Sequence, residues 1–129
     1  MTAQKLNPPT IAAPVGAYSH GVLAPAAGQW LHVSGQIGVR PDGTLATGFA
    51  EQAGLAWENL MAVLAAAGMD ERHLVKVTTY LTNAADLKDL NPVRSRFLKD
   101  ARPASTLLIV KALAREEWLF EVEAVAYRA

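Results

Sequence analysis

Hydrophobic and polar positions alternate most regularly near the end of the chain, where they predict a strand with one buried face. Over residues 118–127 every second side chain is apolar, and a period of two is typical of a half-buried strand. The opposite side of this strand carries Glu121 and Glu123, which point the same way. An acidic pair in so apolar a segment indicates either a functional site or a solvated face. The apolar side consists of Trp118, Phe120, Val122, Ala124 and Ala126.

Further strands are predicted elsewhere along the chain. Residues 74–82 alternate, with Val75, Val77, Thr79 and Leu81 on the face expected to be buried. Residues 18–23, 30–37 and 105–110 are the other predicted strands, and Ser34 with Gly35 indicates a bulge or a close backbone approach. The runs at 105–110 and 118–127 are expected to form a closing hairpin. Residues 1–14 are expected to be an extended lead-in.

A period of three to four residues predicts a first helix over residues 49–68. Glu51 lies in its first turn, where the helix dipole favours an anion, and Gly68 is a natural stop. Its apolar stripe consists of Phe49, Ala53, Trp57, Leu60, Leu64 and Ala67.

A second helix is predicted within residues 86–99, and Pro92 leaves its start open. Either Asn91 is the N-cap of a helix that begins at Pro92, or the helix begins near Asp86 and kinks at the proline. The inner side of this helix is marked in both cases by Leu90, Arg94, Phe97 and Leu98.

The resulting order β-β-α-β-α-β-β predicts a single α+β domain over residues 1–129, with both helices on one face of a mixed sheet. Apolar residues make up 51% of the chain and charged residues only 19%. We therefore expect another subunit to cover the second face of the sheet, and a closed ring of subunits leaves no exposed strand edge.

Composition excludes several classes of function. Lys and Arg equal Asp and Glu at 12 each, so no net field attracts nucleic acid or an anionic membrane. Signal-peptide and membrane-span patterns are missing from the sequence, which predicts a cytoplasmic protein. There is no cysteine, and His20, His32 and His73 lack metal-binding spacing, so neither a thiol nucleophile nor a metal site is expected. Phosphate-binding loops for a nucleotide cofactor are also missing.

A set of polar residues remains as candidate chemistry: Tyr18, Ser34, Asn91, Ser105 and Glu121. Each also has a purely structural explanation, as a core phenol, a bulge residue, a helix cap, a strand start and a solvated acid, respectively. Residue type and spacing do not decide between these alternatives.

Several strings in the sequence carry a family resemblance. Gly-Ala-Tyr-Ser-His at 16–20 is similar to a G-P-Y-S-Q motif, and Val-Ser-Gly-Gln at 33–36 matches V-S-G-Q. Leu90-Asn91, Arg-Pro-Ala-Ser-Thr at 102–106 and Glu-Val-Glu-Ala-Val-Ala at 121–126 follow in the same order. Over nearly its whole length the chain resembles the Rid (YjgF) family of small imine and enamine deaminases.

The resemblance implies a chorismate-mutase-like fold assembled as a homotrimeric barrel, with small-molecule sites in the clefts between subunits. It implies hydrolysis of reactive metabolites such as 2-iminobutanoate and 2-iminopropanoate, a form of metabolite damage control, without metal or organic cofactor. Tyr18, Ser34 and Asn91 match cleft residues, and Glu121 matches the acid that orients or activates water. Backbone N–H groups near Leu107 are expected to polarise the substrate.

Ser105 departs from the family pattern, because the deaminases carry there an arginine that binds the substrate carboxylate. Losing a charge-assisted bidentate contact typically costs a few kcal/mol, or roughly two to three decades in binding. Arg102 or a residue of a neighbouring subunit is a candidate replacement. His20 stands where the family often has glutamine, and it either contributes acid–base capacity or hydrogen-bonds the loop.

These departures predict a hydrolase of altered substrate specificity, in which Ser105 and Asn91 hydrogen-bond the ligand. The alternative is a non-catalytic trimer of the same fold that binds a small metabolite or a partner protein.

Overall fold

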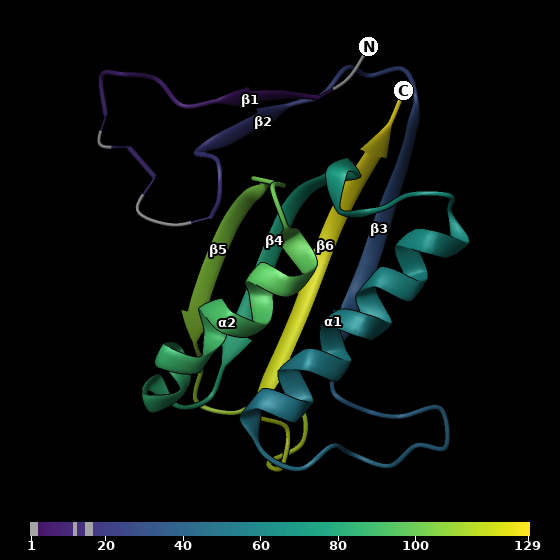
Figure 1. Ribbon diagram of the computed structural model, residues 1–129, viewed down its shortest axis with the longest axis vertical. Coiled ribbons are helices and arrows are strands. Elements are labelled where there is room, and N and C mark those ends of the chain that lie inside the picture. Colours follow the sequence, from purple (N-terminus) through teal and green to yellow (C-terminus); the bar gives the residue numbers. More distant parts are fainter. Residues whose placement is uncertain (1–2, 12, 15–16) are drawn as a thin grey trace.

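The computed structural model describes residues 3–11, 13–14 and 17–129 of the chain. Within them the main sheet has four strands in the order β3 (Gln29–Gln36), β6 (Phe120–Arg128), β4 (Leu74–Leu81) and β5 (Ala104–Ile109) (Figure 1). Strand β5 runs parallel to β4, whereas β6 is antiparallel to both β3 and β4. The sheet is therefore mixed, as predicted.

Helices α1 (Phe49–Ala66) and α2 (Leu87–Leu98) lie on the same face of this sheet (Figure 1). The described residues contain no helix long and apolar enough to cross a membrane. Trp57 of α1 is fully buried and stacks on Phe97 of α2, with ring centroids 5.8 Å apart. The chain leaves α1 through Gly68, whose positive φ of 69° matches the predicted stop.

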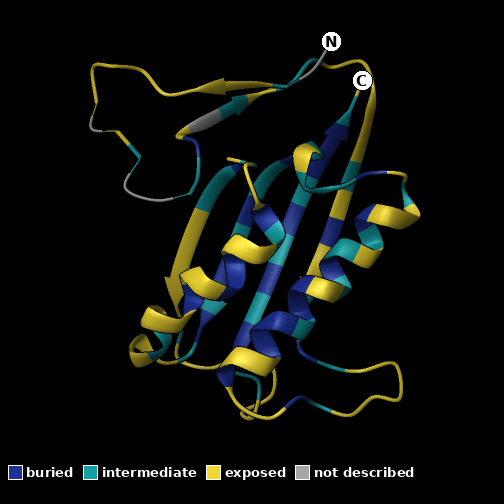
Figure 2. Ribbon diagram, in the orientation of Figure 1, coloured by how far each residue is buried: buried dark blue, intermediate teal, exposed yellow. Residues whose placement is uncertain are grey.

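Strand β6 confirms the alternation predicted from the sequence (Figure 2). Phe120, Val122, Ala124 and Ala126 are buried beneath the helices, while Glu121 and Glu123 are half-buried on the other side. Among the described residues no helix covers that other side, which we call the open face.

The buried face of β4 differs from the prediction at one position. A register irregularity between Leu74 and Lys76 changes which side chains point toward the helices. Leu74 is therefore buried in the core, and Val75, expected there, is only half-buried. Val77, Thr79 and Leu81 lie in the core as predicted.

The expected closing hairpin is wrong, because β5 does not pair with β6. Strand β4 lies between them, parallel to β5 and antiparallel to β6. Helix α2 carries the chain from the end of β4 back to its start, and such a crossover produces parallel pairing. Strand β6 pairs with the other edge of β4.

The lead-in forms structure that the sequence did not predict. Strand β1 (Gln4–Leu6) pairs with β2 (Gly21–Leu23) in a small antiparallel sheet beside the main one (Figure 1). The strand expected over 18–23 is thus shorter, and Ser19 instead forms an isolated bridge with Ala104. Gly16, part of the family-like motif, lies outside the described residues.

Helix α2 begins at Leu87, directly after the 3-10 turn η2 (Ala84–Asp86), and includes Pro92. The alternative with a start near Asp86 is therefore correct, and Asn91 is not an N-cap. Pro92 has no N–H and cannot donate a helical hydrogen bond. The burial of Leu90 and Leu98 in the core offsets the free energy lost with that bond. A second 3-10 turn, η1 (Glu71–His73), precedes β4 and is capped by the side chain of Asp70.

Candidate functional site

Glu121 lies on the open face, against the bulge of β3. A Cβ atom on Gly35 would come within 1.7 Å of Glu121 Oε2, so only glycine leaves room for this carboxylate. The register of β3 shifts between Val33 and Gln36, which confirms the predicted bulge. Ser34 lies exposed in the same bulge, and its carbonyl oxygen accepts a hydrogen bond of 3.1 Å from Gln36 Nε2.

The two carboxylates of the acidic pair have different surroundings. The Tyr80 hydroxyl donates a hydrogen bond to Glu123 Oε1. Glu121 has no hydrogen bond or ion pair with any described residue. Burial, and secondly the negative charge of Glu123, raise the pKa of the Glu121 carboxyl above its usual value of 4.5. Glu121 is thus a half-buried carboxylate with a raised proton affinity and unused acceptor oxygens.

The start of β6 is fixed from the helix side by Gln52 of α1. Its buried amide donates to the Glu117 carbonyl at 3.2 Å and accepts from the Leu119 N–H at 2.8 Å. Both contacts precede Glu121 by four residues or fewer along the chain. Gln52 was not predicted from the sequence, because it lies among apolar positions on the buried side of α1.

A second group of predicted residues meets at a cleft of about 340 Å³ on the helix side of the sheet, at its β5 edge. The Ser19 N–H donates to the Pro103 carbonyl at 2.8 Å and its hydroxyl donates to the Arg102 carbonyl, which fixes the neighbouring Tyr18 segment against β5. The lining residues come from α2, β5 and this segment: Tyr18, Leu87, Leu90, Asn91, Arg94, Ser105 and Leu107.

Three of the lining residues, Leu87, Leu90 and Arg94, were not proposed for the site from the sequence, and Arg94 is the charged one. Its side chain is buried, and its Nη2 donates a hydrogen bond of 2.6 Å to Asn91 Oδ1. Burial lowers the pKa of its guanidinium, although arginine stays charged at neutral pH. It forms no ion pair in the described part of the chain. The sequence did contain one signal for the importance of Arg94, namely a positively charged residue on the inner side of a predicted helix.

Neither Arg102 nor His20 lines the Ser105 cleft. Arg102 Nη1 donates to the carbonyls of Lys99 and Ala101, at 3.0 and 2.8 Å, just beyond the end of α2. The His20 N–H donates to Asn7 Oδ1 at 2.8 Å, and its ring meets that of Tyr18 edge-on.

The two groups of site residues lie on opposite faces of the sheet. Ser105 pairs with Val77, which pairs with Ala124, and all three side chains face the helices. Glu121 is three positions from Ala124 and faces the other way. One chain therefore cannot bring Glu121 and Ser105 to a single small ligand. No cluster of three or more potential metal ligands occurs among the described residues.

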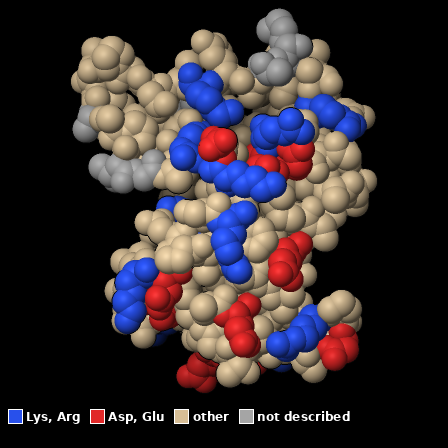
Figure 3. Space-filling model, viewed as in Figure 1, with Lys and Arg blue, Asp and Glu red and all other residues tan. Residues whose placement is uncertain are grey.

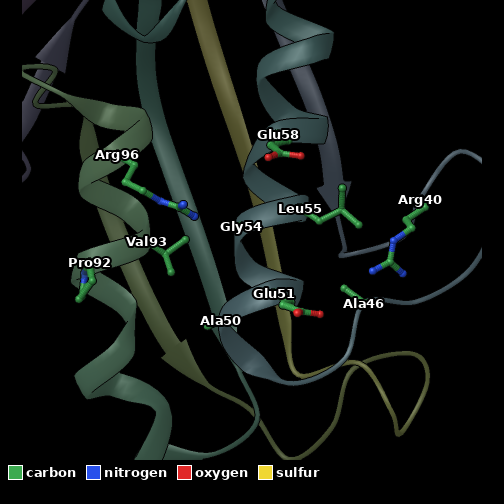
Figure 4. Close-up of a pocket in the computed structure, with 10 residues that line it drawn as sticks. All are labelled: Arg40, Ala46, Ala50, Glu51, Gly54, Leu55, Glu58, Pro92, Val93 and Arg96. Atoms are coloured by element: carbon green, nitrogen blue, oxygen red, sulfur yellow. The ribbon is translucent and has the colours of Figure 1, made fainter.

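A different groove separates the two helices on the outer surface (Figure 4). Arg96 of α2 and Glu51 and Glu58 of α1 line it, together with Arg40 from the loop before α1. Its charges are of both signs, and on the visible face Lys and Arg lie intermixed with Asp and Glu (Figure 3). None of the predicted site residues lines this groove.

Comparison with known proteins identifies the family. The profile described as Endoribonuclease L-PSP matches residues 10–128. A RutC family protein of Aquifex aeolicus is 35% identical over 128 residues, which cover 97% of this chain and 99% of that protein. Human 2-iminobutanoate/2-iminopropanoate deaminase is 36% identical over 114 residues, covering 87% and 80% of the two chains.

The fold agrees with these sequence matches. The crystal structure of YyfB from Yersinia pestis, a protein of unknown function in the conserved Rid family, superposes with a TM-score of 0.88 at 32% identity. The match covers 99% of this chain and 100% of YyfB. Two helices on one face of a mixed sheet are the chorismate-mutase-like arrangement of Rid structures. The chain therefore belongs to the Rid (YjgF) family.

Proposed function

We propose that this protein hydrolyses small reactive 2-imino acids, without a cofactor, in clefts between the subunits of a homotrimer. The observation that carries the proposal is the state of Glu121. Its carboxylate is half-buried, has a raised pKa and is bound by no described residue, as a general base for water requires. The deaminase name of the human relative supports the reaction type.

The reaction needs one group that accepts and returns a proton. Glu121 takes a proton from water as the water oxygen bonds to the carbon of the protonated imine, the iminium, which gives a neutral carbinolamine. The protonated Glu121 then delivers this proton to the amino nitrogen, and the C–N bond breaks. Ammonia leaves and takes the hydroxyl proton, so the products are a 2-oxo acid and ammonium. Such proton transfer contributes about 10²- to 10⁴-fold in rate.

The other predicted residues bind the substrate rather than move protons. Asn91 and Ser105 hydrogen-bond it, Tyr18 closes the cleft, and N–H groups near Leu107 polarise the reacting bond. Ser34, next to Gly35 in the bulge of β3, holds the attacking water. In this proposal His20 contacts Tyr18 at the rim and has no direct role.

Assembly into a trimer is supported by the open face itself. It carries Trp30 and Leu108, which are 42% and 41% exposed in the single chain, beside the half-buried acids. Contact between the open face of one subunit and the β5 edge of the next would bring Glu121 and Ser105 to one cleft. Light scattering should give three times the 13.8 kDa chain mass, and a monomer would refute the proposal.

The activity is tested with 2-aminoacrylate generated in the assay, followed by the loss of imine absorbance. The protein should accelerate this loss, and Glu121→Ala should abolish the acceleration. A rate no faster than buffer refutes the proposed reaction. Thermal stabilisation by small carboxylates without any product would instead favour the non-catalytic binding protein, an alternative supported by Ser105.

Mixing two inactive variants tests whether each cleft is shared. Glu121→Gln damages one half of the site and Asn91→Ala the other. After dissociation and random reassembly, about one quarter of the clefts should combine two intact halves and recover that share of activity. Mixtures as inactive as their components would show that each site lies within one chain.

A further inference from the structure

We propose that Arg94 binds the carboxylate of the ligand in the cleft beside Ser105, and that the ligand is a short, apolar 2-imino acid. The choice of ligand rests on the proposed function, whereas the anion site rests on the contacts of Arg94. An anion site at Arg94 would explain how a cleft with a serine at position 105 can hold a charged substrate.

The charge of Arg94 is not balanced by any ion pair with the described residues. Only 9% of this residue is exposed. A guanidinium offers five N–H donors, yet its one hydrogen bond to the described residues goes to Asn91 Oδ1. A buried charge without a counter-ion is costly, and a carboxylate that enters the cleft reduces this cost. The planar fork of arginine suits two parallel hydrogen bonds to a carboxylate.

Arg94 also lies in the right place, because it lines the same cleft as Ser105. Arg94 comes from α2 and Ser105 from β5, and both line the same cavity of about 340 Å³. The short Ser105 side chain leaves space in front of β5 that a longer side chain would fill. Asn91 is three residues before Arg94 on the helix, and its amide oxygen holds the guanidinium in place.

The remaining walls indicate what the ligand carries besides its carboxylate. Leu87, Leu90 and Leu107 line the cavity, and none of the described residues that line it is acidic. Apolar walls bind a short alkyl group and give no partner to a second charge. A 2-imino acid with a small aliphatic side chain meets both conditions.

Two nearby arginines are excluded from this role by their contacts. Arg102 donates to main-chain carbonyls beyond the end of α2. Arg96 lines the outer groove with Glu51 and Glu58 (Figure 4), and its guanidinium carbon lies 5.4 Å from the centre of the Phe97 ring. Arg96 is on the same helix, two residues from Arg94, and is therefore a matched control.

The test compares binding of 2-oxobutanoate with binding of its uncharged amide, 2-oxobutanamide, by calorimetry. The wild-type protein should prefer the acid. Arg94→Gln should lose roughly 10²-fold in affinity for the acid and little for the amide, whereas Arg96→Gln should match the wild type. An unchanged preference in Arg94→Gln, or none in the wild type, overturns the inference.

NMR spectra of the Arg94 guanidinium in the wild-type protein test the inference even if Arg94→Gln fails to fold. In the wild-type protein the side-chain nitrogen resonances of Arg94 should shift on titration with 2-oxobutanoate and not with the amide. Those of Arg96 should stay unchanged in both titrations. Arg94 resonances that ignore the acid overturn the inference without any variant.

Failure of this inference can be told from failure of the proposed function. A wild-type protein that binds 2-oxobutanoate through Arg94 but does not hydrolyse 2-aminoacrylate would retain the anion site and lose the enzyme. A protein that hydrolyses 2-aminoacrylate with the same KM and kcat after Arg94→Gln would retain the enzyme and lose the anion site.

Discussion

The two faces of the main sheet differ in what their side chains do. On the helix side, Val77, Val122 and Ala124 are buried among apolar neighbours. On the open face the adjacent positions hold Glu121, Glu123 and the Tyr80 hydroxyl, with polar atoms that are half-buried and not all bonded.

The difference shows how one strand supplies both stability and chemistry. Because side chains of β6 alternate, a change at one residue acts on the core and a change at the next acts on the candidate site. The Ser105 cleft departs from this rule, since it places polar groups on the helix side at the β5 edge. Paired substitutions on β6 can therefore separate folding from function.

The largest difference is expected within the acidic pair. Glu121→Gln keeps the shape of the side chain and removes the base, so kcat should fall by about 10²- to 10⁴-fold. Glu123→Gln should lower kcat by less than about tenfold, because the Glu123 carboxylate accepts a hydrogen bond from the Tyr80 hydroxyl instead of binding the attacking water. Steady-state hydrolysis of 2-aminoacrylate measures both. Equal losses in the two variants would remove the distinction between the carboxylates.

A stability difference is expected between two valines of β6. Val122→Ala opens a cavity in the core and should lower the free energy of unfolding by about 1.5–3 kcal/mol. Val125→Ala lies on the half-buried open face and should instead weaken subunit association, seen as a concentration-dependent mass. Thermal melts and light scattering separate the effects. A larger loss of folding stability for Val125→Ala would contradict the assignment of the faces.

A smaller effect is expected where β3 touches Glu121. The Cβ of Gly35→Ala would overlap Glu121 Oε2 and push the carboxylate aside, so kcat should fall by roughly tenfold. The melting temperature should change little, since the end of a flexible side chain moves and the backbone does not. Wild-type activity in Gly35→Ala would mean that the position of this carboxylate is unimportant.

The smallest effect is a shift in pH dependence. The base form of Glu121 is required, so activity should fall as the pH drops through its raised pKa. Glu123→Gln removes one cause of that raised pKa, and the acidic limb of the kcat/KM profile should move to lower pH. A limb that stays in place would show that Glu123 has no influence on the titrating group.

Local patterns in the sequence predicted the parts of the fold that local geometry controls. The alternation around Glu121, the stripe of α1 and the bulge at Gly35 all follow from spacing alone. Pairing partners could not be read in this way, because the place of β5 depends on a crossover through α2. Strand β1 has three exposed residues and no pattern to detect.

The candidate site was predictable to the same extent. Residues in recognisable motifs, such as Asn91 and Ser105, were proposed from the sequence, and the structure brings these two to one cleft. Arg94 was missed as a site residue because its significance comes from burial, which depends on how α2 packs on the sheet. The separation of Glu121 from Ser105 likewise needed the strand register.

The amide of Gln52 links the first helix to the strand that carries the candidate base. Since this one side chain holds main-chain atoms of Glu117 and Leu119, a displacement of α1 moves the entry to β6 with it. The Leu119 amide proton should consequently exchange with solvent as slowly as those of the core, despite lying just outside the strand. The position of the carboxylate is in this sense set by a helix on the far side of the sheet.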